Sequence, residues 1–399
     1  MVLTHARVAV IGAGIAGLVI STALRAAGAE VAVFEQAAEF SPIGAGLQLS
    51  PNGVRVLHAL GHTEGLAEKA VRAGSIEIRR WDDGAVLSAV SHGDDCVTTF
   101  GAPYYLIHRA DLHELLVSRA GEHNVHMGHR LERVVECGGG VELRFANGAR
   151  FGADLVIGAD GTHSAVRAAI VCDEPVFSGY SVYRGLIPAG VVPSLATDPR
   201  VLFWFGPQRH VTYYPIRSGR TIHFSAVCAT ADGRPGSSTT GAETAELAAA
   251  FTDWHPEVRR VVTAARSVTR WGLFDRDLVQ RYHAHHAVLV GDAAHPMLPY
   301  LSQGANQALE DAAALLDRLG PWLAGQVSLD DSLARYEADR GPRTAEVHRQ
   351  SRLRGEAFHL SDGDRQRERD FELAHEQDLD HLAWIYGHDT RAADLELTE

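Results

Sequence analysis

A glycine-rich turn near the start of the chain constrains its fold more than any other feature. Residues 7–11 read RVAVI, the pattern of a buried strand, and the run GAGIAG of residues 12–17 follows at once. An apolar helical stretch over 18–27 comes next, and a second strand over 30–34 ends at Glu35. Strand, glycine turn, helix, strand and acid in this order predict a βαβ unit that binds a dinucleotide.

The residues of this unit have separate tasks. Gly12 allows the tight turn, Gly14 lets backbone N–H groups approach a pyrophosphate, and Gly17 lets the helix pack closely on the strand. The helix N-terminus faces the phosphate charge. Glu35 stands where a carboxylate can accept hydrogen bonds from ribose hydroxyls, which suits FAD or NAD. We expect the cofactor contacts of this unit to come from Gly12, Gly14, Ala16, Gly17, Glu35 and Gln36.

Two further motifs lie far along the chain and point to a flavin. In GADG (158–161), Asp160 ends a strand; it could bind N–H or hydroxyl groups, position a second nucleotide or cap the next helix. In GDAAHP (291–296), Asp292 is placed to bind a ribityl hydroxyl. Gly304-Ala305-Asn306 then opens a helix whose amides can stabilise negative charge on a reduced flavin. The three motifs together predict FAD, held by one nucleotide domain assembled from distant parts of the chain.

Composition excludes several classes of partner. The net charge is −13, so no nucleic-acid partner is expected. The apolar run 8–20 is too short to span a bilayer, and we predict a cytoplasmic protein, monomeric or homodimeric, with no membrane partner. His283, His285 and His286 lead into a buried strand with no acid or cysteine to complete a metal site, so no metal is predicted.

The order of strand and helix patterns predicts an α/β fold: a Rossmann-like FAD-binding domain, an inserted mixed β-sheet substrate domain and C-terminal helices. Short alternating strands dominate between 175 and 270. Helices are expected over 307–319 and 329–353, with a break at Gly320-Pro321. The predicted boundaries are 1–75, 101–174 and 271–325 for the FAD-binding domain, 76–100 and 175–270 for the substrate domain, and 326–399 for the C-terminal helical region.

The three motifs, together with HRADL (108–112) and RYEADR (335–340), resemble the single-component FAD-dependent aromatic hydroxylases, in the salicylate, 3-hydroxybenzoate and 6-hydroxynicotinate hydroxylase-like branch. The resemblance covers nearly the whole chain. It implies the aromatic-hydroxylase-like fold and the chemistry of these flavoprotein monooxygenases. NAD(P)H binds transiently and reduces FAD, O₂ adds to give a flavin C4a-hydroperoxide, and the distal oxygen is transferred to an electron-rich ring.

The resemblance also implies roles for individual residues. Arg109 would contact the cofactor, and the backbone of Val134 would read the adenine. Gly46 would belong to a loop that passes over the isoalloxazine, and Pro296 would shape the pocket wall beside the cofactor.

The candidate substrate residues are His210, Tyr214, Gln48 and Tyr300. His210 and Tyr214 share one face of a strand because they are four residues apart, and the resemblance implies that both face the substrate. A base there would make a phenol or ring N–H more electron-rich. Gln48 and Tyr300 stand where some relatives carry histidines, which argues against a simple salicylate or hydroxynicotinate assignment.

The function expected from these residues is hydroxylation of a small electron-rich aromatic compound by an FAD-dependent monooxygenase that consumes NAD(P)H and O₂. One alternative is oxygenation of an indole or other fused ring in natural-product biosynthesis. Another is a flavin-binding protein without oxygenase turnover, whose NAD(P)H oxidation no aromatic compound would stimulate.

Overall fold

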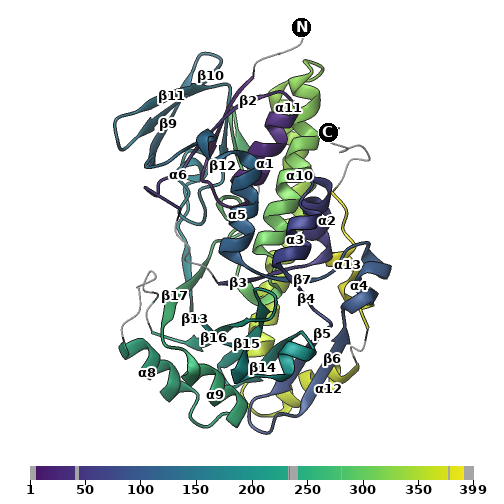
Figure 1. Cartoon of the computed structure of the whole chain (residues 1–399). Helices are drawn as coiled ribbons and strands as arrows, with labels where there is room; N and C mark the ends of the chain where they lie inside the picture. The colour runs from purple at the N-terminus through teal and green to yellow at the C-terminus, as the bar shows by residue number, and fades with distance from the viewer. Residues whose placement is uncertain are drawn as a thin grey trace.

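A six-stranded sheet, called the parallel sheet here, forms the upper half of the molecule (Figure 1). The computed structural model describes residues 6–40, 45–231, 233, 241–279, 281–375 and 378–390. The strand order is β18-β19-β12-β1-β2-β8, and only the β18–β19 pair is antiparallel. The strands are β1 (Arg7–Ile11), β2 (Glu30–Phe34), β8 (Val125–His126), β12 (Leu155–Gly158), β18 (His283–Ala284) and β19 (Ala287–Leu289).

Both faces of the parallel sheet are covered, which explains why its strands are continuous apolar runs. A three-stranded antiparallel sheet lies on one side, where Phe34 contacts Phe145 with ring centroids 4.6 Å apart. Helices pack on the other side and against one another. The covering elements are β9 (Leu131–Cys137), β10 (Gly140–Phe145), β11 (Arg150–Ala153), α1 (Ile15–Ala26), α2 (Pro51–Ala59), α3 (Thr63–Lys69), α5 (Arg109–Ala120) and α10 (Gly304–Leu323).

A seven-stranded sheet forms the lower half, in the order β17-β13-β16-β15-β14-β5-β6. It is mixed, because β14 and β5 run parallel while the other pairs are antiparallel. Its outer face is covered by α8 (Gly241–Ala250) and α9 (Pro256–Ala264). The strands are β5 (Ser75–Arg80), β6 (Val86–Ser91), β13 (Val176–Pro188), β14 (Arg200–Gly206), β15 (Arg209–Ile216), β16 (Thr221–Ala229) and β17 (Val268–Asp275).

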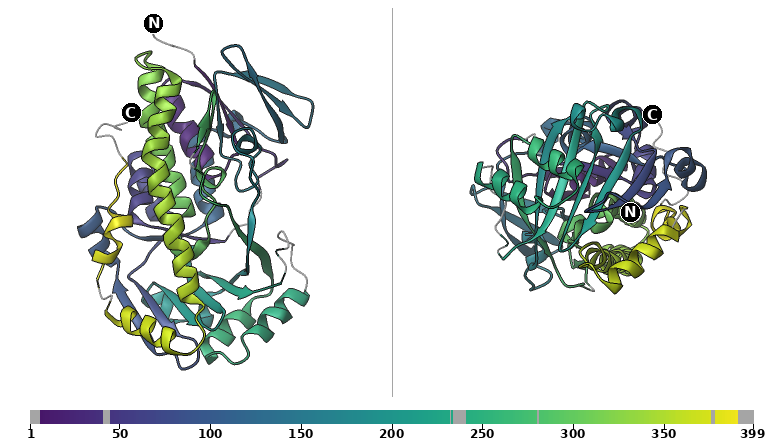
Figure 2. Two further views of the ribbon diagram at one scale, coloured as in Figure 1. Left: turned by 180° about the vertical axis from the view of Figure 1, so that it is seen from behind. Right: turned by 90° about the horizontal axis from the view of Figure 1, so that it is seen from below.

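Helix α11 (Leu329–Phe358) runs the length of the molecule and joins the two halves (Figure 2). A small sheet, β3-β7-β4, lies between them. The remaining elements are β3 (Gly46–Leu49), β4 (Val71–Arg72), β7 (Tyr105–His108), α4 (Gly93–Phe100), η1 (Glu122–Asn124), α6 (Ala165–Ala168), η2 (Ala189–Val191), α7 (Ser194–Thr197), η3 (Gly291–Ala293), η4 (Pro299–Leu301), α12 (Asp364–His375), η5 (Asp380–Leu382) and α13 (Ala383–Tyr386).

One sequence expectation about the helices is wrong. The break predicted at Gly320-Pro321 does not occur, because α10 continues through both residues to Leu323. A proline removes one backbone hydrogen bond and strains the preceding turn. Here Ala324 N–H still donates to Gly320 O at 3.0 Å, and Trp322 is buried in the main core, so tertiary packing keeps the last turn helical.

The predicted architecture, a Rossmann-like unit with an inserted mixed sheet and C-terminal helices, is confirmed. The domain boundaries drawn from the sequence stay predictions.

Candidate active site

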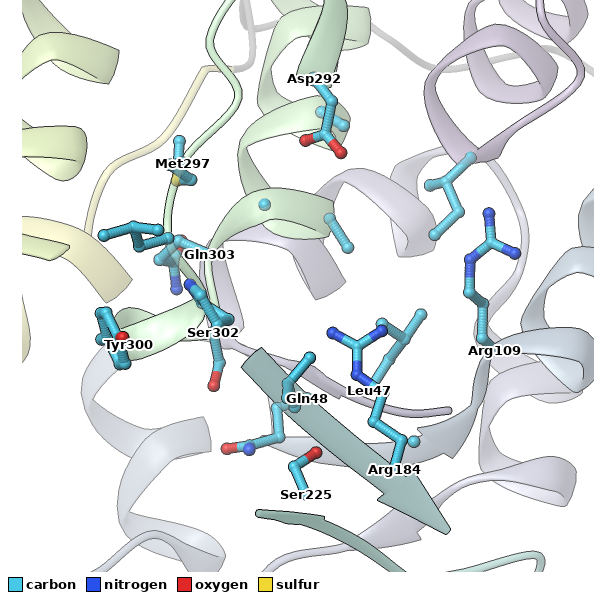
Figure 3. Close-up of a pocket in the computed structure, with 18 of the residues that line it drawn as sticks. Leu47, Gln48, Arg109, Arg184, Ser225, Asp292, Met297, Tyr300, Ser302 and Gln303 are labelled. Carbon is cyan, nitrogen blue, oxygen red and sulfur yellow. The ribbon is translucent and has the colours of Figure 1, made fainter. Parts of the chain in front are cut away.

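A cavity of about 380 Å³ lies between the two large sheets. One wall is built from the carboxyl ends of parallel strands, with Gly14 following β1, Ala159 following β12 and Asp292 following β19. Ligands bind at this edge in open parallel sheets. The other wall is the inner face of β13, β15 and β16. Figure 3 shows Tyr300, Ser302 and Gln303 on one side of the cavity and Arg109 on the other.

The three glycines of the first turn serve different purposes. Gly12 has φ +100°, and a Cβ there would lie 2.4 Å from the carbonyl oxygen of Ala159. A Cβ on Gly17 would lie 1.9 Å from the carbonyl oxygen of Gly12, so both glycines allow the chain to pack on itself. Gly14 differs, because a Cβ would meet nothing within 4 Å. It lines the cavity at the N-terminus of α1, where no side chain caps the helix, so this end is open to a phosphate ligand.

Two acids predicted to bind cofactor are engaged with the backbone. Glu35 accepts hydrogen bonds from the N–H groups of Ala13 and Ala37, each at 2.9 Å. Asp160 accepts from Ala165 N–H at 2.7 Å and from the Ser164 hydroxyl, so it caps α6. The capping alternative left open for Asp160 therefore describes its contacts. Any additional contact of either acid with a cofactor stays a prediction.

The opposite end of this wall combines a carboxylate, a guanidinium cation and a helix N-terminus. Asp292 is open to the cavity but surrounded by protein, and this burial raises the pKa of its carboxyl. The Arg109 guanidinium lines the cavity and makes no hydrogen bond or ion pair within the described part of the chain. Gly304 and Ala305 begin α10, and the side chain of the N-cap residue Gln303 makes no capping bond. These groups fit FAD: the arginine and the helix amides suit its phosphates and ring edge, and the Asp292 carboxylate can accept a hydrogen bond from a ribityl hydroxyl.

The predicted cofactor residues divide into those that line the cavity and those that do not. Asn306 does not line the cavity; its side chain accepts from Ser50 N–H and donates to Gln48 O, each at 3.1 Å, and thereby ties β3 to α10. The residues that line the cavity are Gly14, Ala16, Gly46, Arg109, Asp292, Gly304 and Ala305. Those outside its lining are Gly12, Gly17, Glu35, Gln36, Val134, Asp160, Pro296 and Asn306. Their cofactor contacts stay predictions.

The sheet wall presents its side chains in cross-strand rows. His210 on β15 and Val182 on β13 flank Val227 on β16, and all three line the cavity. In the next row, Thr212 and Arg184 flank Ser225 in the same way. Because alternate residues of a strand share a face, His210, Thr212 and Tyr214 all point inward, as the four-residue spacing predicted.

His210 is held from behind by a residue that the sequence did not single out. Its Nδ1 lies 2.8 Å from Nε2 of His359, and the Tyr300 ring stands edge-on with centroids 5.7 Å apart. Burial, and then the neighbouring His359, lower the pKa of His210 well below its usual range. A neutral imidazole of this kind can accept a proton from a ligand in the cavity.

Gln48 and Tyr214 form the floor. Gln48 Oε1 accepts a hydrogen bond from Tyr104 OH at 2.7 Å, and Gln48 is close enough to Tyr214 to influence the pKa of its hydroxyl. Burial raises the pKa of the Tyr214 hydroxyl, which keeps it protonated and able to donate. Gly46 is required beside them, because a Cβ there would lie 2.7 Å from both Tyr214 and His223.

Arg184 is the cavity residue that the sequence reasoning missed most plainly. Its guanidinium points into the cavity, it makes no hydrogen bond or ion pair with the rest of the described chain, and burial lowers its pKa. A signal was present, since Arg184 is the only charged residue of β13 and shares a strand face with Val182. An unpaired arginine in a cavity is a receptor for an anionic ligand.

The described ranges carry neither a metal-binding cluster nor a membrane-spanning helix. They hold no group of three or more histidine, cysteine, aspartate or glutamate residues able to bind a metal ion. His283 instead pairs with Glu337 at 3.0 Å, and His286 Nδ1 lies 2.8 Å from the carbonyl of Asp154. Within the same ranges, every helix is too short or too polar to cross a membrane.

Comparison with known proteins places this site in a family. A family described as "FAD binding domain" matches residues 5–351, and the chain belongs to it. The 3-amino-4-hydroxybenzoate 2-monooxygenase of Streptomyces cremeus is 54% identical over 96% of this chain and 95% of its own length. The 6-hydroxynicotinate 3-monooxygenase of Pseudomonas fluorescens is 33% identical over 86% of this chain and 89% of its own. The crystal structure of Klebsiella pneumoniae HpxO with FAD and uric acid matches with a TM-score of 0.84 at 25% identity, over 94% of each chain.

These findings confirm the resemblance stated from the motifs and settle the class of activity. The chain is an FAD-dependent monooxygenase that uses NAD(P)H and O₂ and hydroxylates a small aromatic compound. Neither the fused-ring alternative nor the alternative without oxygenase turnover is favoured by these relatives. Oligomeric state and location stay predictions.

Proposed function

We propose that the substrate is an amino-hydroxybenzoate and that oxygen enters at ring carbon 2, between the carboxylate and the amino group. The observation that carries this proposal is the unpaired Arg184, which offers a carboxylate a charge-assisted hydrogen bond. Ser225 in the same row adds a hydroxyl. The 54% identity to an enzyme named for 3-amino-4-hydroxybenzoate supports the same substrate class.

The spacing of the polar groups suits a substituted benzoate. Arg184 and His210 lie two strands and one row apart, so their Cα atoms are separated by roughly 12 Å from ordinary strand spacings. Both side chains line the same cavity. The cavity volume of about 380 Å³ is in the usual range for a small ligand.

The chemistry at carbon 2 follows from the amino group. Bound FAD would carry two electrons from NAD(P)H to O₂ and supply one oxygen atom to the ring. The nitrogen lone pair makes the neighbouring carbon electron-rich, and removing an N–H proton as the C–O bond forms strengthens this effect. His210 would accept that proton at Nε2, while Tyr214 and Gln48 would orient the ring hydroxyl and Tyr300 would pack against the substrate. Overall, Ar–H, O₂, NAD(P)H and H⁺ become Ar–OH, H₂O and NAD(P)⁺.

The test is NADH and NADPH consumption by FAD-loaded protein, with H₂O₂ followed in parallel. The panel holds 3-amino-4-hydroxybenzoate, its carboxamide, 3- and 4-hydroxybenzoate, salicylate, 6-hydroxynicotinate and indole. We expect coupled consumption with the amino-hydroxybenzoate, and a product with its new hydroxyl at carbon 2 by NMR. Coupled turnover of indole would contradict the proposal. So would coupled turnover of salicylate in preference to 3-amino-4-hydroxybenzoate.

The proposed base has its own test. His210→Ala should retain FAD and lower the rate of hydroxylation by about 10²–10⁴-fold, the usual contribution of a general base, with electrons diverted to H₂O₂. Wild-type coupling in this variant would remove His210 from the mechanism.

A further inference from the structure

Behind His210, a second buried histidine continues away from the cavity. His359 directly follows α11, and its Nε2 lies 2.8 Å from His210 Nδ1. The ring centroids are 5.0 Å apart and the planes are 28° apart, so the two nitrogens lie almost on the line that joins the ring centres. One of these nitrogens must donate and the other accept. His210 Nε2 has no hydrogen-bond partner among the described residues, and since His210 lines the cavity, this nitrogen is the one available to substrate.

The backbone fixes His359 in this place. Gln208, in the turn before β15, donates its N–H to the carbonyl oxygen of His359 at 3.0 Å. Because His210 lies only two residues further on, this contact sets the two imidazoles side by side. Tyr180 on β13 stacks on the His359 ring at 4.4 Å with planes 17° apart. The pair is therefore built by the docking of α11 onto the seven-stranded sheet.

The outer nitrogen of His359 is open to solvent. His359 keeps 7% of its surface exposed. Its Nδ1 has no hydrogen-bond partner among the described residues. This nitrogen is nevertheless not fully buried, so water can reach it. His348, on the same helix, differs because both of its ring nitrogens are buried without a hydrogen bond to the described residues, and its Nε2 lies 3.6 Å from the Asp275 carboxylate. Four ring nitrogens thus run in series from the cavity, through His210 and His359, to the surface.

We propose that His359 completes a proton relay that connects the substrate with solvent through His210. The proposal rests on the proposed function for the identity of the proton. When the C–O bond forms at carbon 2, the substrate N–H proton passes to His210 Nε2, the Nδ1 proton of His210 passes to His359 Nε2, and the Nδ1 proton of His359 passes to water. When the carbon 2 C–H bond breaks and its electrons restore the ring, that proton leaves to water. The nitrogen then regains one proton through the same series in reverse, which restores both tautomers.

The electrostatics of the pair support this use. Burial lowers the pKa of His359 to about 4 and lowers that of His210 as well. Both imidazoles are therefore neutral at neutral pH, and each has one N–H and one lone pair, as the series requires. The titratable groups that face the pair are the hydroxyls of Tyr180 and Tyr300, whose pKa values burial raises, so both remain neutral too.

Variants of His359 can distinguish a role in proton transfer from a role in packing alone. Glutamine can keep a hydrogen bond to His210 but cannot pass a proton through its side chain. His359→Gln should lower kcat at least about tenfold, as expected for impaired proton transfer, and leave KM for the aromatic within about twofold. Added imidazole should restore part of the kcat of His359→Gly. The matched control is His348→Gln, another buried histidine of α11, which should keep wild-type kcat.

A second readout needs no turnover. In FAD-loaded protein without substrate, ¹⁵N-histidine NMR should show one downfield imidazole N–H resonance that is lost in both His210→Phe and His359→Phe and retained in His348→Gln. Unchanged kcat in His359→Gln, a loss of kcat that imidazole does not rescue, or the absence of the shared resonance would each overturn the relay. If wild-type enzyme is coupled only with another aromatic, the proposed substrate fails, and the relay is tested with that compound and by the resonance.

Discussion

At the residue scale, Arg184 is the sharpest probe of substrate choice. Arg184→Gln removes the charge that we assign to the substrate carboxylate. A charge-assisted hydrogen bond contributes about 1.5–3 kcal/mol, so we expect KM for 3-amino-4-hydroxybenzoate to rise about 10–100-fold. The carboxamide of the substrate carries no charge and provides the matched control, since its KM should change little. Steady-state kinetics with the two compounds measures both values, and an equal rise for both would show that Arg184 does not bind the carboxylate.

Gly14 is the residue that tests the cofactor wall without disturbing the fold. A Cβ there would meet no protein atom within 4 Å, so Gly14→Ala should change the free energy of unfolding by no more than about 1 kcal/mol. The same Cβ points into space that FAD would occupy, and we expect the Kd for FAD to rise at least about tenfold by fluorescence titration.

Gly12→Ala provides the contrast to this variant. Its Cβ would lie 2.4 Å from a carbonyl oxygen at φ +100°, so this variant should lose folded protein as well as FAD. Unchanged FAD affinity in Gly14→Ala would show that the FAD pyrophosphate does not bind beside Gly14.

At the scale of elements, a buried charge network holds α10 against α11. Arg340 on α11 donates to Asp311 at 2.7 Å and to Glu310 at 2.6 Å, and Asp311 also accepts from Gly291 N–H. Arg340→Met would remove the cation that the two buried carboxylates share, leaving Glu310 with Arg343 and Asp311 with His295. We expect a loss of about 3–5 kcal/mol in the free energy of unfolding, measured by urea denaturation at pH 7.

The same two helices supply the control. Arg318 on α10 pairs with Asp339 on α11 at 2.7 Å, but both side chains are exposed. Arg318→Met should cost less than about 1 kcal/mol. Similar losses for both variants would mean that burial of the network does not determine its strength.

Acid should weaken this network from a definite pH. Burial alone would raise the pKa of Asp311, but His295 and Arg340 outweigh it and hold the pKa at about 2 in the folded protein. Because the folded pKa is below the ordinary value, the stabilisation is complete above about pH 4 and is lost as the pH falls toward 2. Urea midpoints measured between pH 6 and pH 3 should therefore fall more steeply in wild type than in Asp311→Asn. If the urea midpoints of the two proteins fell equally with pH, the acid sensitivity would not come from Asp311.

At the scale of the whole molecule, the cavity is the place where the two halves meet. Its walls come from both large sheets, so a cofactor bound there contacts both. FAD at about 1,000 times its Kd would stabilise the folded state by about 4 kcal/mol. Removing FAD should then lower Tm by about 5 °C in calorimetry, and reloading should restore it. Hydrogen exchange should show that β15 loses protection when FAD is removed. An equal Tm with and without FAD would contradict a cofactor site between the two halves.

Local pattern was enough to determine the first βαβ unit, the three motifs, the mixed sheet and the inward face of β15, because strand periodicity and glycine turns are set by residues close in sequence. It failed at Pro321, where burial of Trp322 outweighs a local helix-breaking signal. Only the tertiary structure decided which side chains converge. Strand register places Arg184 and Thr212 in one row on either side of Ser225, and the docking of α11 brings His359 to His210 across 149 residues. Such contacts depend on how distant elements pack, and no local pattern encodes that.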